Sequence, residues 1–100
     1  MKFSKGSFLI SYGKLEEPSF KEEQGWISKE DSQYGFYKKL GGWQATDIPS
    51  GTSICWRKTR KECATFIEQR DIQEKLARIR EKEDYKKLVK KLEKYKEPVK

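Results

Sequence analysis

Residues 57–97 contain no glycine and no proline, and this uninterrupted stretch limits the folds open to the chain more than any other feature. Strong helix formers fill it, and Thr59-Arg60-Lys61-Glu62 near its start is a capping box. In such a box the threonine hydroxyl and the glutamate carboxylate each satisfy a free amide. We therefore predict a long helix that begins at Arg60 and that Pro98 stops.

The apolar stripe of this predicted helix changes direction twice. At about 100° per residue, three groups of apolar side chains follow one another, the first and third on one side and the second nearly opposite. The groups are Cys63, Phe66 and Ile67, then Ile72, Leu76 and Ile79, and finally Tyr85, Leu88, Leu92 and Tyr95. We expect either kinks near residues 70 and 82 or a straight helix, roughly 55 Å long, that touches two surfaces and projects beyond the sheet.

The preceding segment, residues 34–57, predicts a three-stranded antiparallel meander. Three runs rich in aromatic and β-branched residues, 34–39, 43–48 and 52–57, are separated by two turns that contain glycine. Glycine supplies the positive φ that tight turns between strands need. The strand predicted at Ser7–Tyr12 makes a four-stranded sheet the alternative to a three-stranded one.

Residues 13–33 lack clear periodicity and carry a net charge of −3, so we predict a loop or irregular acidic arm there. Three isolated apolar side chains would anchor it to the core: Phe20, Trp26 and Ile27. An acidic arm that mimics nucleic acid is the functional alternative. The whole pattern predicts an α+β fold, with one small domain at 1–80 and a basic helical extension at 81–100.

The whole formal net charge of +7 lies in residues 57–100, because the acids and bases of residues 1–56 balance. Charge of one sign on one segment is informative about partners and not about fold. The longest apolar run is only Phe8-Leu9-Ile10, which predicts neither a signal peptide nor a membrane span. We expect a cytoplasmic protein that does not bind membranes, although a basic amphipathic helix also suits a membrane surface.

The chain offers little for catalysis. It has no histidine and two cysteines, Cys55 and Cys63, too few ligands for a zinc site. We expect no metal, no cofactor and no enzymatic activity. Two reduced and mostly buried thiols are the main expectation, and a disulfide between them is the alternative.

Two groups of basic residues are candidate contacts for nucleic acid. Lysines on one face of the last predicted helix suit phosphate contact without sequence preference, and a second group lies where the sheet meets the helix. The first group is Lys86, Lys87, Lys90, Lys91 and Lys94, and the second is Arg57, Lys58, Arg60 and Lys61. A helix N-terminus beside basic residues also suits a phosphate. A lysine-rich helix that is merely soluble is the alternative.

A protein partner is the second hypothesis. The apolar stripe opposite the lysines has the 3-4-3 spacing of a short heptad seam, and the predicted hairpin carries exposed aromatic candidates. The stripe is Tyr85, Leu88, Leu92 and Tyr95, and the hairpin aromatics are Tyr37 and Trp43.

Two resemblances extend this interpretation. Gly42-Trp43, Ser50-Gly51 and the capping box resemble, over residues 34–70, the arm-type DNA-binding domains of phage tyrosine recombinases and the related plant transcription-factor domain. That resemblance implies a sheet that enters the major groove and a helix behind it. Here only four basic residues near strand ends would face the groove: Lys38, Lys39, Arg57 and Lys58.

The chain as a whole also resembles short accessory proteins of bacteriophages and mobile elements, some of which are anti-CRISPR inhibitors. We therefore expect a non-enzymatic protein that binds nucleic acid or a nucleoprotein through its basic C-terminal helix. The alternative is a protein-interaction inhibitor of a nucleic-acid enzyme. The sequence does not indicate an oligomeric state.

Overall fold

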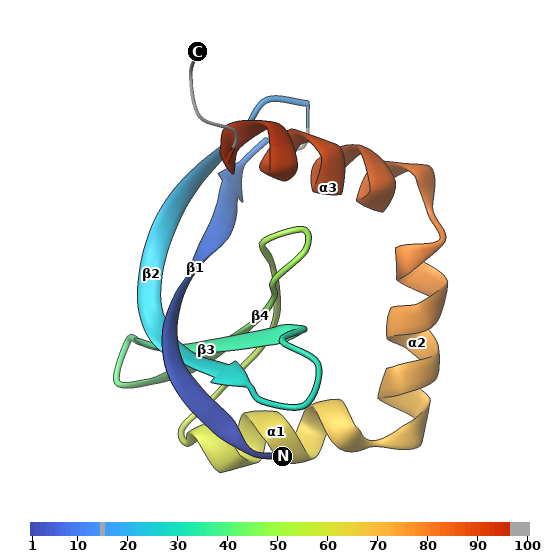
Figure 1. The fold of residues 1–100 in the computed structure, drawn as a ribbon. Helices are drawn as coiled ribbons and strands as arrows, with labels where there is room; N and C mark the ends of the chain where they lie inside the picture. The colour runs from blue at the N-terminus through green and yellow to red at the C-terminus, as the bar shows by residue number, and fades with distance from the viewer. Residues whose placement is uncertain (15, 97–100) are drawn as a thin grey trace.

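The computed structural model describes residues 1–14 and 16–96 and has an α+β fold (Figure 1). Five antiparallel strands form one open sheet in the order β1-β2-β3-β4-β5, and three helices follow them. The strands are β1 (Phe3–Gly13), β2 (Pro18–Ser28), β3 (Tyr34–Lys39), β4 (Gly42–Asp47) and β5 (Thr52–Arg57). The helices are α1 (Arg60–Glu68), α2 (Arg70–Arg80) and α3 (Glu83–Lys96). The α+β class is thus confirmed, but the sheet has one strand more than the larger predicted number.

The additional strand is β2, so the prediction of a loop or irregular arm at 13–33 is wrong. It pairs with β1 along its entire length, from Phe3 opposite Ser28 to Gly13 opposite Pro18. Only Ser28 at its end is buried, and its other residues are exposed or half-buried, so no alternation of buried apolar and exposed polar residues marks it in the sequence. Pairing with β1, and not burial, therefore specifies this strand.

Gly25 explains how β2 reaches the rest of the sheet. β2 pairs with β3 only through Trp26 opposite Phe36 and Ile27 opposite Gly35, where the long hairpin crosses onto the meander. A Cβ atom at Gly25 would overlap the carbonyl oxygen of Phe36. The close approach of the two backbones therefore requires glycine at this position.

The meander at 34–57 is confirmed nearly residue for residue. β3 and β5 match the predicted runs, and β4 begins and ends one residue earlier than predicted. The β3–β4 turn uses positive φ at Leu40 (50°) and Gly41 (74°). The sequence therefore predicts the regular β3–β5 half of the sheet but not the long β1–β2 hairpin.

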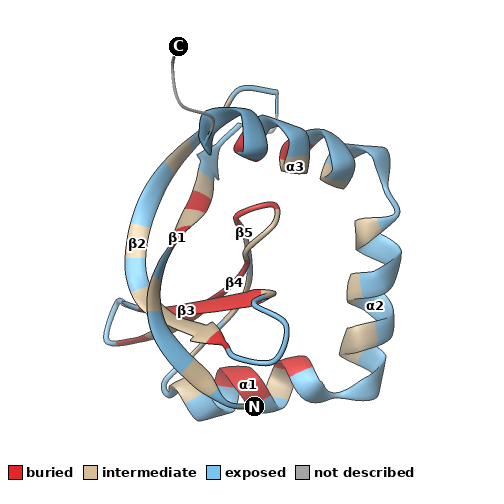
Figure 2. Cartoon of the chain, viewed as in Figure 1, coloured by how far each residue is buried: buried red, intermediate tan, exposed pale blue. Residues whose placement is uncertain are grey.

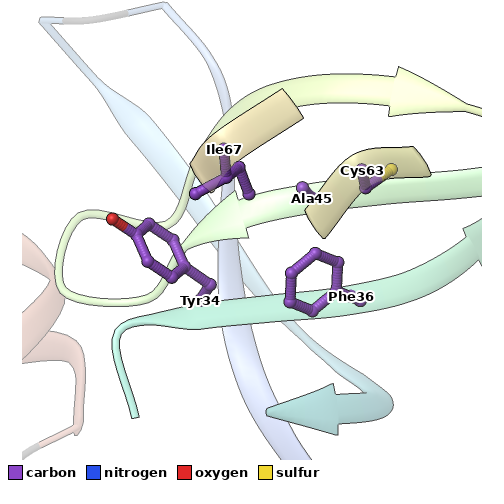
Figure 3. Close-up of a cluster of buried hydrophobic side chains, with 5 residues drawn as sticks. All are labelled: Tyr34, Phe36, Ala45, Cys63 and Ile67. Atoms are coloured by element: carbon purple, nitrogen blue, oxygen red, sulfur yellow. The ribbon is translucent and has the colours of Figure 1, made fainter. Parts of the chain in front are cut away.

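Apolar side chains lie on both faces of the sheet. On one face Tyr34 and Phe36 of β3 and Ala45 of β4 pack against Cys63 and Ile67 of α1 (Figure 3). On the other face a smaller cluster joins β1 to β3 through Phe8, Ile10 and Tyr37. Helix α1 thus completes the main core, and the β1–β2 hairpin covers the opposite face.

The long helix is in fact three helices, and the breaks lie close to the predicted kinks at 70 and 82. Gln69 is extended, with φ −64° and ψ 139°, and the backbone turns again at Glu81 and Lys82. The side chain of Gln73 bridges the first break, since its Nε2 in α2 donates a hydrogen bond to the carbonyl oxygen of Ile67 in α1 at 2.6 Å. The straight-helix alternative is therefore wrong.

The three helices form an arc that leaves the sheet at α1 and returns to it at α3 (Figures 1 and 2). Leu88 and Leu92 of α3 are 4% and 1% exposed. Leu92 packs beside Gly51 in the turn before β5, and the ring of Tyr95 lies 5.4 Å from that of Phe20 in β2. Helix α3 thus packs against the rest of the protein and does not project from it in the way that the straight-helix alternative implied. The predicted stop at Pro98 lies outside the described residues.

Candidate nucleic-acid interface

The lysines of α3 are all exposed. Leu88 and Leu92 fix the inner face of the helix, Tyr85 and Val89 flank them and are half-buried, and the remaining residues of α3 are exposed. The structure thus places all five predicted lysines on one outer surface, which we call the α3 lysine face: Lys86, Lys87, Lys90, Lys91 and Lys94. Among the described residues none of the five forms an ion pair with a carboxylate.

Lys91 lies at the edge of this face. Its Nζ donates to the backbone carbonyl oxygen of Glu16 at 3.0 Å, which ties α3 to the β1–β2 turn. Lys94 and Tyr95 line a shallow depression with Phe20 beside it. Within α3 the acidic residues Glu83 and Asp84 occupy the first turn, where carboxylates favour the helix dipole. Beyond that turn α3 carries the exposed Glu93 among the lysines, so its outer surface is predominantly, but not wholly, cationic.

The second predicted group, Arg57 to Lys61, is divided by the fold. The guanidinium carbon of Arg60 lies 4.5 Å from the ring centroids of Phe3 and Trp26 and 5.7 Å from that of Trp43. The guanidinium of Arg57 stacks on Phe66 at 4.6 Å. Both arginines are therefore held by the protein's own aromatic rings.

Strand register explains part of this arrangement. Lys38, Trp43 and Arg57 lie directly opposite one another on β3, β4 and β5 and so share one face of the sheet. The Nζ of Lys38 lies 5.8 Å from the ring of Trp43. By contrast Lys58 and Lys61 are exposed, and neither lies over an aromatic ring in the part of the chain that the structure describes. The α1 end is thus basic, but its two arginines support the fold.

The N-terminus of α1 has the threonine half of the predicted capping box. The hydroxyl oxygen of Thr59 accepts a hydrogen bond from the amide of Glu62 at 3.1 Å. This bond uses one of the donors that a phosphate would need, and the carboxylate of Glu62 stands in the same turn. The α1 N-terminus is therefore a weaker anion site than the sequence suggests.

The predicted protein-binding stripe is occupied by the protein itself. Leu88 and Leu92 are buried against the sheet, Tyr95 packs on Phe20, and the hydroxyl of Tyr85 donates to the Oδ2 of Asp47 at 2.8 Å. The expectation of a spare apolar face is wrong for this reason. The long separation between these partners in the chain hides the contacts from sequence reasoning.

The hairpin aromatics also differ from expectation. Tyr37 is buried, with its ring 6.1 Å from that of Phe8, and burial together with the charge of Glu23 raises its pKa. It therefore lies in the core and cannot contact a partner. Trp43 is half-buried beneath Lys38 and Arg60.

Asp47 is the centre of a buried hydrogen-bond network that the sequence analysis did not predict. It is 3% exposed and accepts hydrogen bonds from Ser50 Oγ at 2.7 Å, Gln33 Nε2 at 3.0 Å and Arg80 at 3.3 Å, besides that from Tyr85. Only the local Asp47-Ile-Pro-Ser50 turn has a sequence signal, because aspartate often bonds the backbone that follows it. Arg80 and Tyr85 reach Asp47 from the junction between α2 and α3, so this network fixes the junction to the sheet.

The environment of this network shifts two pKa values. Burial, followed by the hydrogen bond to Asp47 and the charge of Asp47, raises the pKa of Tyr85 to about 12. For Arg80, burial lowers the pKa, whereas its interactions with Tyr34 and Asp47 raise it, and the net shift is upward. Both groups thus keep the protonation state that the hydrogen bonds need across the neutral range.

Cys55 and Cys63 are both free thiols, which agrees with the main expectation. Burial and the neighbouring Cys63 raise the pKa of Cys55 to about 12, and burial also raises the pKa of Cys63. The Sγ of Cys63 donates to the carbonyl oxygen of Trp43 at 3.5 Å. Thiols held in this protonated form are poor nucleophiles.

Comparisons with known proteins add no function. No family model, no curated protein and no solved structure matches the chain. Within residues 1–14 and 16–96, no group of three or more acidic or cysteine side chains is placed to hold a metal ion. No helix in the same residues is both long and apolar enough to cross a membrane. The geometry of the α3 lysine face is therefore the main guide to function.

Proposed function

We propose that the protein binds nucleic acid through the α3 lysine face, without enzymatic activity and without strong sequence preference. The observation that carries this proposal is the docking of α3 by Leu88 and Leu92, which directs five lysines outward from a fixed helix. A fixed array of ammonium groups displaces counterions from phosphates, and that release supplies affinity.

The dimensions of the face fit a phosphate backbone. From Lys86 to Lys94 the helix rises about 12 Å, which is close to the width of the B-DNA major groove, roughly 12 Å. Lysine is a point charge that binds phosphate, whereas base edges are read mainly by arginine, asparagine and glutamine. Binding that depends on charge more than on sequence follows from this composition.

The α1 end is a less suitable surface for the same task. Arg57 and Arg60, which would read guanine best, are stacked on aromatic rings. The resemblance to recombinase arm-type domains implies a sheet that enters the major groove. Because these arginines are stacked on aromatic rings, the sheet is poorly suited to that role. The inhibitor alternative has no separate support either, because the two leucines of its apolar stripe are buried in the fold.

The test is a fluorescence-polarisation titration with labelled 20-base-pair duplex DNA, and with single-stranded DNA and RNA of equal length, between 50 and 200 mM NaCl. We expect the affinity for the duplex to fall steeply with salt, with a logarithmic slope near −4 for about four or five phosphate contacts. Two duplexes of different sequence should bind within about threefold of each other.

A matched pair of variants separates the α3 lysine face from net charge. The first variant changes Lys86, Lys87, Lys90 and Lys94 to Gln, and the second changes Lys2, Lys29, Lys39 and Lys75, which are exposed elsewhere. We expect the first to lose about a hundredfold in affinity at 100 mM salt and to show a flatter slope, and the second to lose less than about fivefold. Equal losses in the two variants, or no binding of wild type at 50 mM salt, would contradict the proposal.

A further inference from the structure

A shallow depression lies where the C-terminal half of α3 crosses the end of the β1–β2 hairpin (Figure 1). It has a volume of about 620 Å³, and its walls come from the end of β1, the start of β2 and α3. They include Tyr12, Pro18, Phe20, Lys91, Lys94 and Tyr95. These segments come from opposite ends of the chain, so only the return of α3 to the sheet creates this surface.

Two tyrosine rings are open to solvent in this depression. Tyr12 is 52% exposed and Tyr95 is 57% exposed, more than any other aromatic side chain in residues 1–14 and 16–96. Tyr12 lies opposite Ser19 of β2, and so small a neighbour leaves the ring uncovered. The ring of Tyr95 contacts Phe20, which holds it while more than half of the residue stays exposed. Single exposed apolar side chains are ordinary, but two rings gathered in one depression point to a binding surface.

Two lysines of α3 line the same depression. Lys91 donates to the backbone carbonyl oxygen of Glu16, and because that oxygen carries no formal charge the bond leaves the positive charge of Lys91 in place. Lys94 is exposed beside Tyr95. No carboxylate lines the depression in the part of the chain that the structure describes. Positive charge and exposed aromatic rings thus lie together at one end of the α3 lysine face.

This combination indicates which form of nucleic acid fits best. Lysines bind the phosphates of a duplex and of a single strand alike. An aromatic ring adds affinity only where a base is free to stack on it, and the bases of a duplex are already stacked on one another. Every base has a π face, so stacking adds affinity without sequence preference.

A membrane surface fits the same residues less well. Lysines and tyrosines also suit a membrane interface, but a helix that lies on a membrane needs a continuous apolar face. On α3 that face would be formed by Leu88 and Leu92, which are buried in the fold. Nucleic acid needs only the rings and the charges that are exposed.

We propose that this depression binds unpaired nucleotides, whose bases stack on Tyr12 and Tyr95 while their phosphates contact Lys91 and Lys94. The site rests on the proposed nucleic-acid binding and gives it a preference for single strands over duplexes. Single-stranded DNA and RNA both present these bases and phosphates, so either can occupy it.

The test is a fluorescence-polarisation titration of the full chain at 100 mM NaCl with three labelled probes. They are a 20-nucleotide oligothymidylate, a 20-nucleotide oligouridylate and a 20-base-pair DNA duplex. We expect both single strands to bind at least fivefold more tightly than the duplex. In the double variant with Tyr12→Leu and Tyr95→Leu, single-strand affinity should fall at least tenfold and duplex affinity less than twofold.

The matched control keeps the rings. The double variant with Tyr12→Phe and Tyr95→Phe loses only two hydroxyl groups and should bind single strands within about twofold of wild type. Tyr12→Leu alone serves if the double leucine variant does not fold, and it should lower single-strand affinity at least threefold. Circular dichroism checks that each variant is folded.

The outcomes separate this site from the proposed function. Unchanged single-strand affinity in a folded leucine variant, with a loss in the variant that changes four α3 lysines to Gln, would overturn the site and leave the proposed function standing. If no probe bound even at 50 mM NaCl, both would be wrong. Vesicles of phosphatidylcholine and phosphatidylserine form the last arm: if they, and not the single strands, bound in a way that the leucine variant abolished, the depression would be a membrane contact and the proposal would be wrong.

Discussion

The two basic ends of the molecule use their cations differently. At the α1 end, arginines stack on the protein's own aromatic rings, so their charges help to hold the hairpin, the meander and α1 together. On α3, lysines stand outside a helix that two leucines fix, and they bind almost nothing in the fold. A similar density of positive charge in the sequence therefore serves structure at one end and is available to a partner at the other.

The strongest test of this contrast is a substitution that weakens the packing of α3 on the sheet. Leu92→Ala should reduce the free energy of unfolding by about 3 kcal/mol, because it opens a cavity beside Gly51. Nucleic-acid affinity should fall with it, since the lysines then lie on a helix that is no longer fixed. Chemical denaturation measures the first effect, and polarisation measures the second. The control is Val89→Ala at a half-buried position of the same helix, which should lower the free energy of unfolding by less than about 1 kcal/mol.

At the α1 end the expected effect is on stability and not on binding. Arg60→Gln removes a cation that contacts three rings and should cost about 2 kcal/mol. Its exposed neighbour provides the control, because Lys58→Gln should change stability by less than about 0.5 kcal/mol. Thermal unfolding monitored by circular dichroism compares the two. If Arg60→Gln lowered the affinity for duplex DNA but left the free energy of unfolding unchanged, Arg60 would contact nucleic acid, and the two ends would not differ in the way described.

The junction between α2 and α3 gives a pH-dependent test. The pKa of Tyr85 is raised from its ordinary value of 10.0 to about 12 in the folded protein. The folded state therefore retains this proton more strongly than the unfolded state. The resulting stability is fully present below about pH 10 and is lost as the pH rises towards 12.

Tyr85→Phe should accordingly cost about 1 kcal/mol near neutral pH, and its difference from wild type should shrink between pH 10 and 12. Urea unfolding at pH 8, 10 and 11.5 measures this difference. Cys55, whose pKa is also raised to about 12, titrates in both proteins and so cancels. A constant difference at all three pH values would show that the bond to Asp47 is not responsible.

The smallest effect is expected from single lysines on α3. Lys90→Gln should leave the free energy of unfolding within about 0.5 kcal/mol of wild type and lower duplex affinity about fivefold. Lys91→Gln should in addition lower stability slightly, because Lys91 donates to the carbonyl oxygen of Glu16. Denaturation and polarisation on the same preparations separate the two contributions. A Lys90→Gln variant with full affinity would argue against a contact at the middle of the face.

Local signals explain what the sequence predicts well. Glycine-containing turns and short β-rich runs define β3, β4 and β5, and the hydroxyl of Thr59 marks the start of α1. The change of direction of the apolar stripe also marks the candidate positions for breaks near 70 and 82, since one straight helix would not bury all three groups on one surface. These features depend on residues within a few positions of one another.

Distant partners explain what the sequence leaves open. β2 is a strand because it pairs with β1, although its own residues are mostly polar. Asp47 becomes the centre of a network only when Arg80 and Tyr85, more than thirty residues away, fold onto it.

The sequence by itself thus determined the meander, the helix start, the two positions at which the helical segment could bend and the placement of the positive charge in the second half of the chain. Tertiary structure decided which basic residues face outward. Aromatic rings from β1, β2 and β4 surround Arg60, and the turn before β5 receives Leu92. Both arrangements join segments far apart in the chain, and no local pattern encodes the free energy of such contacts.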